Sequence, residues 1–137
     1  MERAPARRRS KVPWIILAAT SPVFVFTVAL SIRNDGFFEP FTILAVGMIT
    51  GYAGVGAMVA SREPRNPIGW GMMVMGLGFL LTGLSDEATR YTYLTDPGGL
   101  PFGSVWAWMT KWTYLFAIGP AALLIAIFPT GHVLSRR

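Results

Sequence analysis

The sequence of 137 residues contains no cysteine, and this absence removes several kinds of site at once. A chain without thiols has no disulfide, no iron–sulfur cluster, no thiolate zinc site and no cysteine nucleophile. Histidine is nearly absent too, since His132 is the only one and has no second ligand type beside it. We interpret His132 as a solvated residue at a helix exit, and we expect neither a metal nor a cofactor.

Charged residues are scarce as well, at 14% of the chain against about 25% in globular domains, whereas hydrophobic residues make up 53%. The charges leave four uncharged stretches of 20 to 24 residues, namely 12–32, 40–61, 66–85 and 112–135. A bilayer core about 30 Å thick is crossed by roughly 20 apolar residues of helix. The sequence therefore predicts an all-α integral membrane protein with four transmembrane helices in an antiparallel bundle.

The predicted transmembrane domain covers residues 13–129, between a basic segment of residues 1–12 and an exit segment of residues 130–137. Its helices are placed at about residues 14–32, 41–60, 67–84 and 105–128. Pro22 is expected to kink the first helix, and Gly119-Pro120 the fourth. The acidic connection 85–103 is expected to begin with a short amphipathic helix lying on the membrane surface.

The stretch "SREPRNP", residues 61–67, gathers turn-forming residues and positive charge between two apolar runs. Pro64 ends the second helix, because the residue before a proline is disfavoured in the helical region. Asn66 is a favoured N-cap, and Pro67 suits the first position of a helix. Trp70 follows at the depth where indoles anchor to the membrane interface. The stretch is predicted to be a tight hairpin between two membrane helices.

Positive charge is concentrated on one side of the predicted membrane domain. Nine basic residues fall in the terminal segments and the hairpin: Arg3, Arg7, Arg8, Arg9, Lys11, Arg62, Arg65, Arg136 and Arg137. Three remain on the other side: Arg33, Arg90 and Lys111. Cytoplasmic segments carry the excess of lysine and arginine, so both termini are predicted to be cytoplasmic. The protein is expected in a bacterial plasma (inner) membrane, as a multi-pass protein with lipid as its main contact and no nucleic-acid partner.

Glycines are frequent in the second and third helices, and Gly47, Gly51 and Gly54 are the candidates for close helix packing. Gly47 and Gly51 form a GxxxG pair, which makes a flat strip for another helix. The strip is either the seam of a homodimer or a contact inside one bundle, and the second interpretation is favoured.

The predicted spans contain no carboxylate and no histidine, so they lack the side chains that act as catalytic acids and bases. The protein is therefore expected not to be an enzyme. Asp86, Glu87 and Arg90 have helical spacing at the outer mouth of the third helix. They are interpreted as a solvated, ion-paired helix end, with recognition of an external cation or peptide as the alternative.

Two motifs, "SREPRNPIGW" and "FPTGHVLSRR", resemble the N-terminal membrane region of a group of bacterial two-component sensor histidine kinases. In that group an arginine-x-proline-x-asparagine-proline-isoleucine-glycine-tryptophan turn joins two membrane helices, and an F-P-D-G-R-L-P-S-R-R-W-like segment follows the last of them. The matching residues are Arg62, Pro64, Asn66, Pro67, Ile68, Gly69 and Trp70, then Phe128, Pro129, Gly131, Leu134, Ser135, Arg136 and Arg137. Thr130 and His132 depart from the family's aspartate and arginine.

The resemblance covers about residues 53–137 and implies a sensory, signal-transmitting membrane module without kinase domains. A signal at the outer loop or in the bilayer would shift the glycine-rich helices against the fourth helix and pass into residues 128–137. Possible partners are a second copy, a kinase or another membrane protein. A stand-alone accessory or regulatory subunit is the alternative function, and a small transporter is the third, disfavoured by the absence of a carboxylate in the predicted spans.

Overall fold

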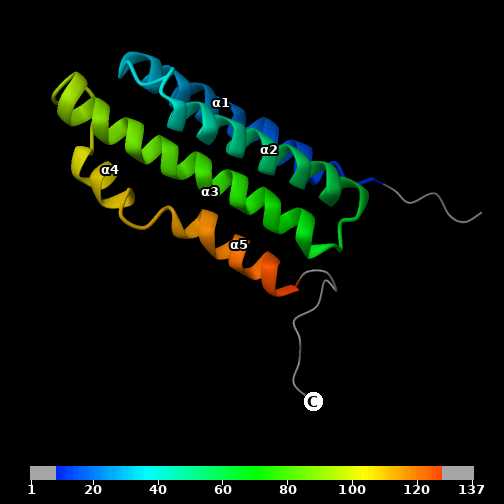
Figure 1. The fold of residues 1–137 in the computed structure, drawn as a ribbon. Coiled ribbons are helices and arrows are strands. Elements are labelled where there is room, and N and C mark those ends of the chain that lie inside the picture. Colours follow the sequence, from blue (N-terminus) through cyan, green and yellow to red (C-terminus); the bar gives the residue numbers. More distant parts are fainter. Residues whose placement is uncertain (1–8, 128–137) are drawn as a thin grey trace, which may run out of the picture.

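The structure, a computed structural model, describes residues 9–127, and within that range the chain is helical with no β-strand (Figure 1). The elements are α1 (Val12–Arg33), α2 (Pro40–Arg62), α3 (Pro67–Arg90), the π-helical turn η1 (Tyr91–Thr95), α4 (Gly103–Met109) and α5 (Leu115–Ile127). The α1, α2 and α3 helices are long and apolar enough to cross a membrane. Large apolar side chains are exposed along α1, α2 and α5, which suits contact with lipid. The predicted all-helical fold is confirmed, and three of its helices have the length and composition of membrane spans.

The α1 helix runs through Pro22 without interruption. Proline has no N–H, so the carbonyl of Ala18, four residues earlier, lacks its helical partner. The hydroxyl of Ser21 donates to this carbonyl at 2.8 Å. A backbone group that lipid cannot satisfy is thus satisfied within the helix itself.

The predicted hairpin between the second and third helices is confirmed. Asn66 caps α3, its Oδ1 accepting from the backbone N–H of Ile68 at 2.9 Å, and Pro67 takes the first helical position. The indole Nε1 of Trp70 donates to the carbonyl of Pro64 at 2.9 Å, so this side chain closes the turn. The start of α1 lies beside the same turn, since the N–H of Ser10 donates to the carbonyl of Ser61 at 2.9 Å.

The α3 helix is the centre of the molecule, with α1 and α2 on one side and α4 and α5 on the other (Figure 1). Its contact with α2 is a backbone-to-backbone approach built on three glycines. A Cβ at Gly56 would lie 2.5 Å from the nitrogen of Met73, and a Cβ at Gly76 would lie 2.5 Å from that of Ala53. A Cβ at Gly69 would lie 2.7 Å from the nitrogen of Ala60.

The predicted packing glycines have no such neighbours within the chain. A Cβ at Gly47, Gly51 or Gly54 would meet nothing within 4 Å. The favoured interpretation, a contact inside one bundle, is therefore wrong for Gly47 and Gly51, and the homodimer seam stays a prediction. Gly54 lines a cavity between α1, α2 and α3.

The α3 helix is longer than predicted, continuing past Leu84 to Arg90 and then into η1. The hydroxyls of Ser85, Thr89 and Thr92 each donate 2.7 Å hydrogen bonds to carbonyls four residues earlier. Ser85 and Ala88 are fully buried, so this extension packs as part of the helical core. The expected separate surface helix in the connection 85–103 is therefore wrong. The third candidate span, Pro67–Thr95, also contains Asp86 and Glu87, which corrects the prediction that the spans have no carboxylate.

The fourth predicted helix, residues 105–128, is two helices. Between α4 and α5 the chain makes shorter three-residue hydrogen bonds, for example from the N–H of Lys111 to the carbonyl of Trp108 at 3.1 Å. The break precedes the predicted kink, and Pro120 lies inside α5. Only the short apolar helix at residues 115–126 remains from this stretch as a membrane-like segment, so four continuous spans are not observed in residues 9–127.

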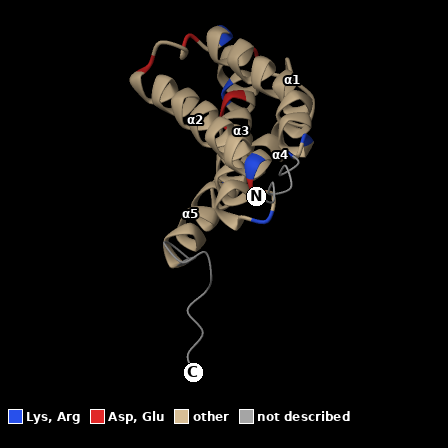
Figure 2. Ribbon diagram, turned by 90° about the vertical axis from the view of Figure 1, so that its right-hand side faces the viewer, with Lys and Arg blue, Asp and Glu red and all other residues tan. Residues whose placement is uncertain are grey.

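Charge separates to the two ends of the helices, and the middle turns of α1 and α2 carry none (Figure 2). We call the end at the α2–α3 hairpin the basic end; its charged residues are Arg9, Lys11, Arg62, Arg65 and Glu63. We call the opposite end the acidic end; its charged residues are Asp35, Glu39, Asp86, Glu87, Asp96, Arg33, Arg90 and Lys111. The basic end has four basic residues against one acidic, and the acidic end has five acidic against three basic.

Candidate functional site

Asn34 holds the acidic end together. It follows the last residue of α1, and only 5% of its surface is exposed. Its Nδ2 donates to the carbonyl of Glu87 at 2.9 Å and to the Oε2 of the same residue at 2.6 Å. Its Oδ1 accepts from the hydroxyl of Thr95 at 2.6 Å. One amide thus joins the end of α1 to α3 and to η1.

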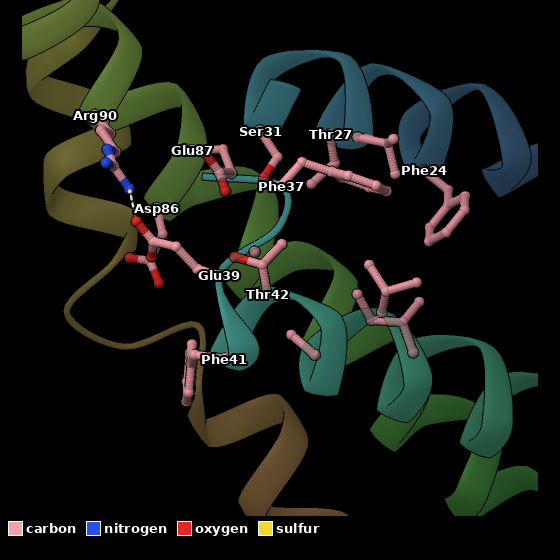
Figure 3. A pocket seen from close by; sticks show the side chains of 15 residues that line it. Phe24, Thr27, Ser31, Phe37, Glu39, Phe41, Thr42, Asp86, Glu87 and Arg90 are labelled. Carbon is pink, nitrogen blue, oxygen red and sulfur yellow. Dashed lines mark ion pairs between the residues drawn. The ribbon is translucent and has the colours of Figure 1, made fainter. Parts of the chain in front are cut away.

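An ion pair closes the other side of this turn. The Nη1 of Arg90 lies 3.6 Å from the Oε1 of Glu39, the residue that precedes α2 (Figure 3). The expected pairing of Arg90 with Asp86 or Glu87 along one helix is therefore not what the structure has. Both charged side chains of the pair are about half exposed, so its contribution to stability is small, at about 0–1 kcal/mol.

A cavity of about 190 Å³ lies between α1, α2 and α3 at this acidic end (Figure 3). Its charged lining residues are Glu39, Asp86, Glu87 and Arg90. Phe24, Phe37 and Phe41 supply aromatic walls, and the hydroxyl residues are Thr27, Ser31 and Thr42. Because three carboxylates and one guanidinium line the cavity, its electrostatic potential is negative and favours a cation.

Two polar groups of this cavity have no protein partner in the described part of the chain. The hydroxyl of Ser31, a residue only 3% exposed, makes no hydrogen bond. The carboxylate of Asp86 is exposed and has no hydrogen bond or ion pair within residues 9–127. A buried hydroxyl without a partner is unfavourable by about 1–3 kcal/mol, and a ligand polar group would remove this penalty.

A second cavity, of about 230 Å³, continues from the first toward the middle of the helices. The two share Phe24 and Ile49, and the second is lined mainly by apolar residues such as Leu17, Leu77 and Leu80. Together they reach the size of small-molecule sites, roughly 300–1,000 Å³. The combined space is polar and acidic at its outer end and apolar along its length.

Replacing Asn34 by alanine is expected to destabilise the acidic end by about 2–4 kcal/mol, because three hydrogen bonds are lost and two of them involve the buried side of Glu87. Thermal unfolding in detergent measures the effect. The matched control is Thr95→Val, which removes only one of these bonds and should lower stability by about 1 kcal/mol. Equal stability of the wild type and the Asn34→Ala variant would contradict this role.

The motif residues of the hairpin lie together at the basic end, far along α3 from the cavity (Figure 1). Pro64, Asn66, Pro67, Gly69 and Trp70 each have the folding role described above, so the motif builds a turn. Arg62 and Arg65 are exposed beside it. The motif residues Phe128, Pro129, Gly131, Arg136 and Arg137 lie outside the described residues, as does His132.

The residues that build the cavity were mostly not predicted. Asp86, Glu87 and Arg90 were singled out from their spacing, but Ser31, Asn34 and Glu39 were not. Asn34 and Glu39 lie at the two ends of the α1–α2 turn. In the sequence they cannot be told from the polar residues that any exposed turn contains. The available signal was the regular recurrence of Ser85, Ala88 and Thr92, which marks a small-residue face continuing past the apolar run.

No cluster of three or more histidine, aspartate or glutamate residues suited to a metal occurs among residues 9–127. No protein-family model, curated protein or solved structure matches this chain. The similarity of the two motifs to sensor kinases therefore depends on the motif residues alone.

Proposed function

We propose that this chain is a membrane-embedded sensory module that passes a signal from the acidic end to the basic end, as the input region of a histidine kinase does. The observation that carries the proposal is the position of α3. Its outer part lines the cavity with Gly83, Asp86, Glu87 and Arg90, and its middle packs against α5. One helix therefore contacts both the candidate ligand site and the last described helix.

The proposed orientation places the basic end in the cytoplasm of a bacterium and the acidic end outside. The excess of arginine and lysine at the basic end supports it. With α4 and α5 counted together as a broken fourth crossing, both termini are cytoplasmic. A reporter fused after Arg137 tests this orientation by its activity inside or outside the cell.

In the proposed mechanism, occupancy of the cavity moves α3 relative to α1 and α2, and α5 follows. The contact that couples α5 is close: a Cβ at Gly78 would lie 2.5 Å from the carbonyl carbon of Phe116. A second contact is the methyl of Leu124 against Gly71, about two turns nearer the basic end. Motion of α5 then reaches the segment that begins at residue 128.

A fusion experiment tests the function. The full chain is joined in frame after Arg137 to the dimerisation and ATP-binding core of a characterised histidine kinase, with one to four residues inserted at the junction. Autophosphorylation in membrane vesicles is expected to vary several-fold along the series, with a period near one helical turn, because each residue rotates the output helix by about 100°. Uniform activity, equal to that of the same core on a single inert membrane helix, would overturn the proposal.

An accessory or regulatory subunit is the second candidate, and one observation favours it. Gly47 and Gly51 leave open space along α2, where a second helix from another protein or another copy would fit closely. Self-association of the purified chain, measured in nanodiscs, separates a second copy from a different partner. A Gly51→Leu variant with unchanged association would exclude this strip as the contact.

A further inference from the structure

We propose that the cavity at the acidic end binds a protonated primary amine that carries an apolar tail. The inference rests on the proposed function for its signalling consequence, because binding at this site is what would move α3. Binding itself is measured without any kinase.

The charge of the cavity selects a cation. Glu39 and Arg90 neutralise each other at 3.6 Å, and Glu87 is held by Asn34. Asp86 has no ion pair in the described chain, although the charge of Lys111, a residue outside the lining, acts on it. The lining itself has three carboxylates and one guanidinium, an excess of two negative charges. An ammonium group beside Asp86 restores the balance, whereas an anion meets repulsion from three carboxylates.

The buried hydroxyl of Ser31 can accept a hydrogen bond from an N–H donor of the ligand. Ser31 lies on α1, lines the same cavity and has an oxygen without a hydrogen-bond partner (Figure 3). A primary ammonium has three N–H donors, and the cavity offers Ser31 from α1 and Asp86 from α3 as acceptors. The hydroxyl of Thr27 is already engaged with the carbonyl of Val23 at 2.9 Å. A quaternary ammonium has the charge but leaves Ser31 unsatisfied.

The second cavity selects an apolar tail. It continues from Phe24 and Ile49 toward the membrane centre, between Leu17, Thr20 and Leu80. On α1 the two cavities extend from Leu17 to Ser31, which is about 21 Å at 1.5 Å per residue. A metal ion fits this shape poorly, and no acidic cluster suited to one occurs in residues 9–127.

Dodecylammonium is the probe for the experiment, with dodecyltrimethylammonium and dodecyl sulfate as comparisons. Binding of each radiolabelled probe to the full chain in phosphatidylcholine nanodiscs is measured by equilibrium dialysis, with empty nanodiscs subtracted. We expect saturable binding of dodecylammonium, about tenfold weaker binding of the quaternary compound and none of the sulfate. Equal binding of all three compounds would overturn the proposal.

Three variants identify the site. Asp86→Asn is expected to weaken dodecylammonium binding about tenfold or more, because the unpaired charge is removed while the fold loses no contact. The matched control is Asp35→Asn, which removes a charge at the same end but outside the cavity lining and should leave binding unchanged. Ser31→Ala is expected to weaken the binding of dodecylammonium more than the binding of dodecyltrimethylammonium.

A blocked cavity gives an independent test. Gly83 lines the cavity, and a Cβ there would be 3.8 Å from the methyl of Thr27, an ordinary contact. Gly83→Leu is therefore expected to extend into the cavity and fill it. Gly47→Leu adds the same side chain in open space on α2. Loss of binding in the first variant only supports the site. Loss in neither variant, or equal loss in both, would overturn it.

The lipid composition of the nanodisc distinguishes a lipid headgroup from a soluble amphiphile as the natural source of the amine. Phosphatidylethanolamine carries the same primary ammonium on a lipid, so nanodiscs containing it should compete with dodecylammonium if a lipid is the natural occupant. Unchanged binding there indicates a soluble amphiphile, and both results support the ammonium site. If the amine binds but the kinase fusion shows uniform activity, this inference stands and the proposed function is contradicted. If kinase activity varies along the junction series but no amine binds, the proposed function stands and this inference is contradicted.

Discussion

Replacing Gly76 by leucine is expected to force α2 away from α3 and to destabilise the folded protein strongly. A Cβ at this position would lie 2.5 Å from the nitrogen of Ala53 and 2.8 Å from its Cβ, so backbone has to move. The variant is therefore expected to be strongly destabilised but still measurable as a folded protein. In a membrane the association of helices depends on such close packing, because lipid is as apolar as the side chains. We expect a loss of about 3 kcal/mol or more, seen as a lower midpoint in dodecyl sulfate titration of the purified protein.

Gly51→Leu is the matched control, with the same substitution on α2 where nothing lies within 4 Å. The midpoint of this variant should equal that of the wild type. If Gly51→Leu and Gly76→Leu were equally destabilising, helix propensity or insertion would explain the effect, and the assignment of Gly76 to the α2–α3 contact would be wrong.

Replacing Gly78 by leucine is the second change with a large expected effect, and it acts on α5. The Cβ would lie 2.5 Å from the carbonyl carbon and 2.6 Å from the oxygen of Phe116, which α5 presents to α3 at this point. The carbonyl of Phe116 lies four residues before Pro120 and so has no helical N–H to accept from. Gly78→Leu is expected to undock α5 while α1, α2 and α3 stay packed.

The absence of cysteine makes this prediction easy to measure. The substitutions Gly71→Cys and Leu124→Cys place two thiols at positions in contact across α3 and α5. Oxidative cross-linking between them should become about tenfold slower in the Gly78→Leu background, as the local concentration of one thiol near the other falls. Gly119→Leu, where a Cβ on α5 would meet nothing within 4 Å, should leave cross-linking unchanged. Unaltered cross-linking in both backgrounds would contradict the coupling of α3 to α5 through Gly78.

The hairpin between α2 and α3 could be predicted from the sequence because its causes are local. Asn66 as a cap and Pro67 as the first helical residue act within a few residues of chain, so their chemistry is readable without a partner. The lengths of the first two helices follow in the same way from the uncharged stretches.

The packing glycines could not be predicted, because their effect depends on what lies opposite. Gly47 and Gly51 have the GxxxG spacing, yet the close contacts are made by Gly56, Gly69 and Gly76. A helix in lipid is apolar on every side, so the sequence has no polar face to indicate which side is covered. The GxxxG spacing shows that a helix surface is flat, but it does not show which helix, if any, packs against that surface.

The candidate site was only partly predicted, for a related reason. The charge at Asp86 ends the uncharged stretch and so predicts the end of the third helix near Leu84. The helix continues instead, because small and hydroxyl residues such as Ser85 and Thr92 allow it to pack. Asn34 forms its bonds with residues more than fifty positions later in the chain. The cavity arises from this meeting of distant segments, which single-sequence patterns do not encode.

The separation of charge between the two ends has an electrical consequence. In the proposed orientation the basic end faces the side of a bacterial membrane that is negative, and the acidic end faces the positive side. Turning the molecule over would carry the net charge of each end against the field, at about 2.3 kcal/mol for each elementary charge per 100 mV. An energised cell therefore favours one insertion direction strongly, and this bias should weaken as the membrane is depolarised during synthesis.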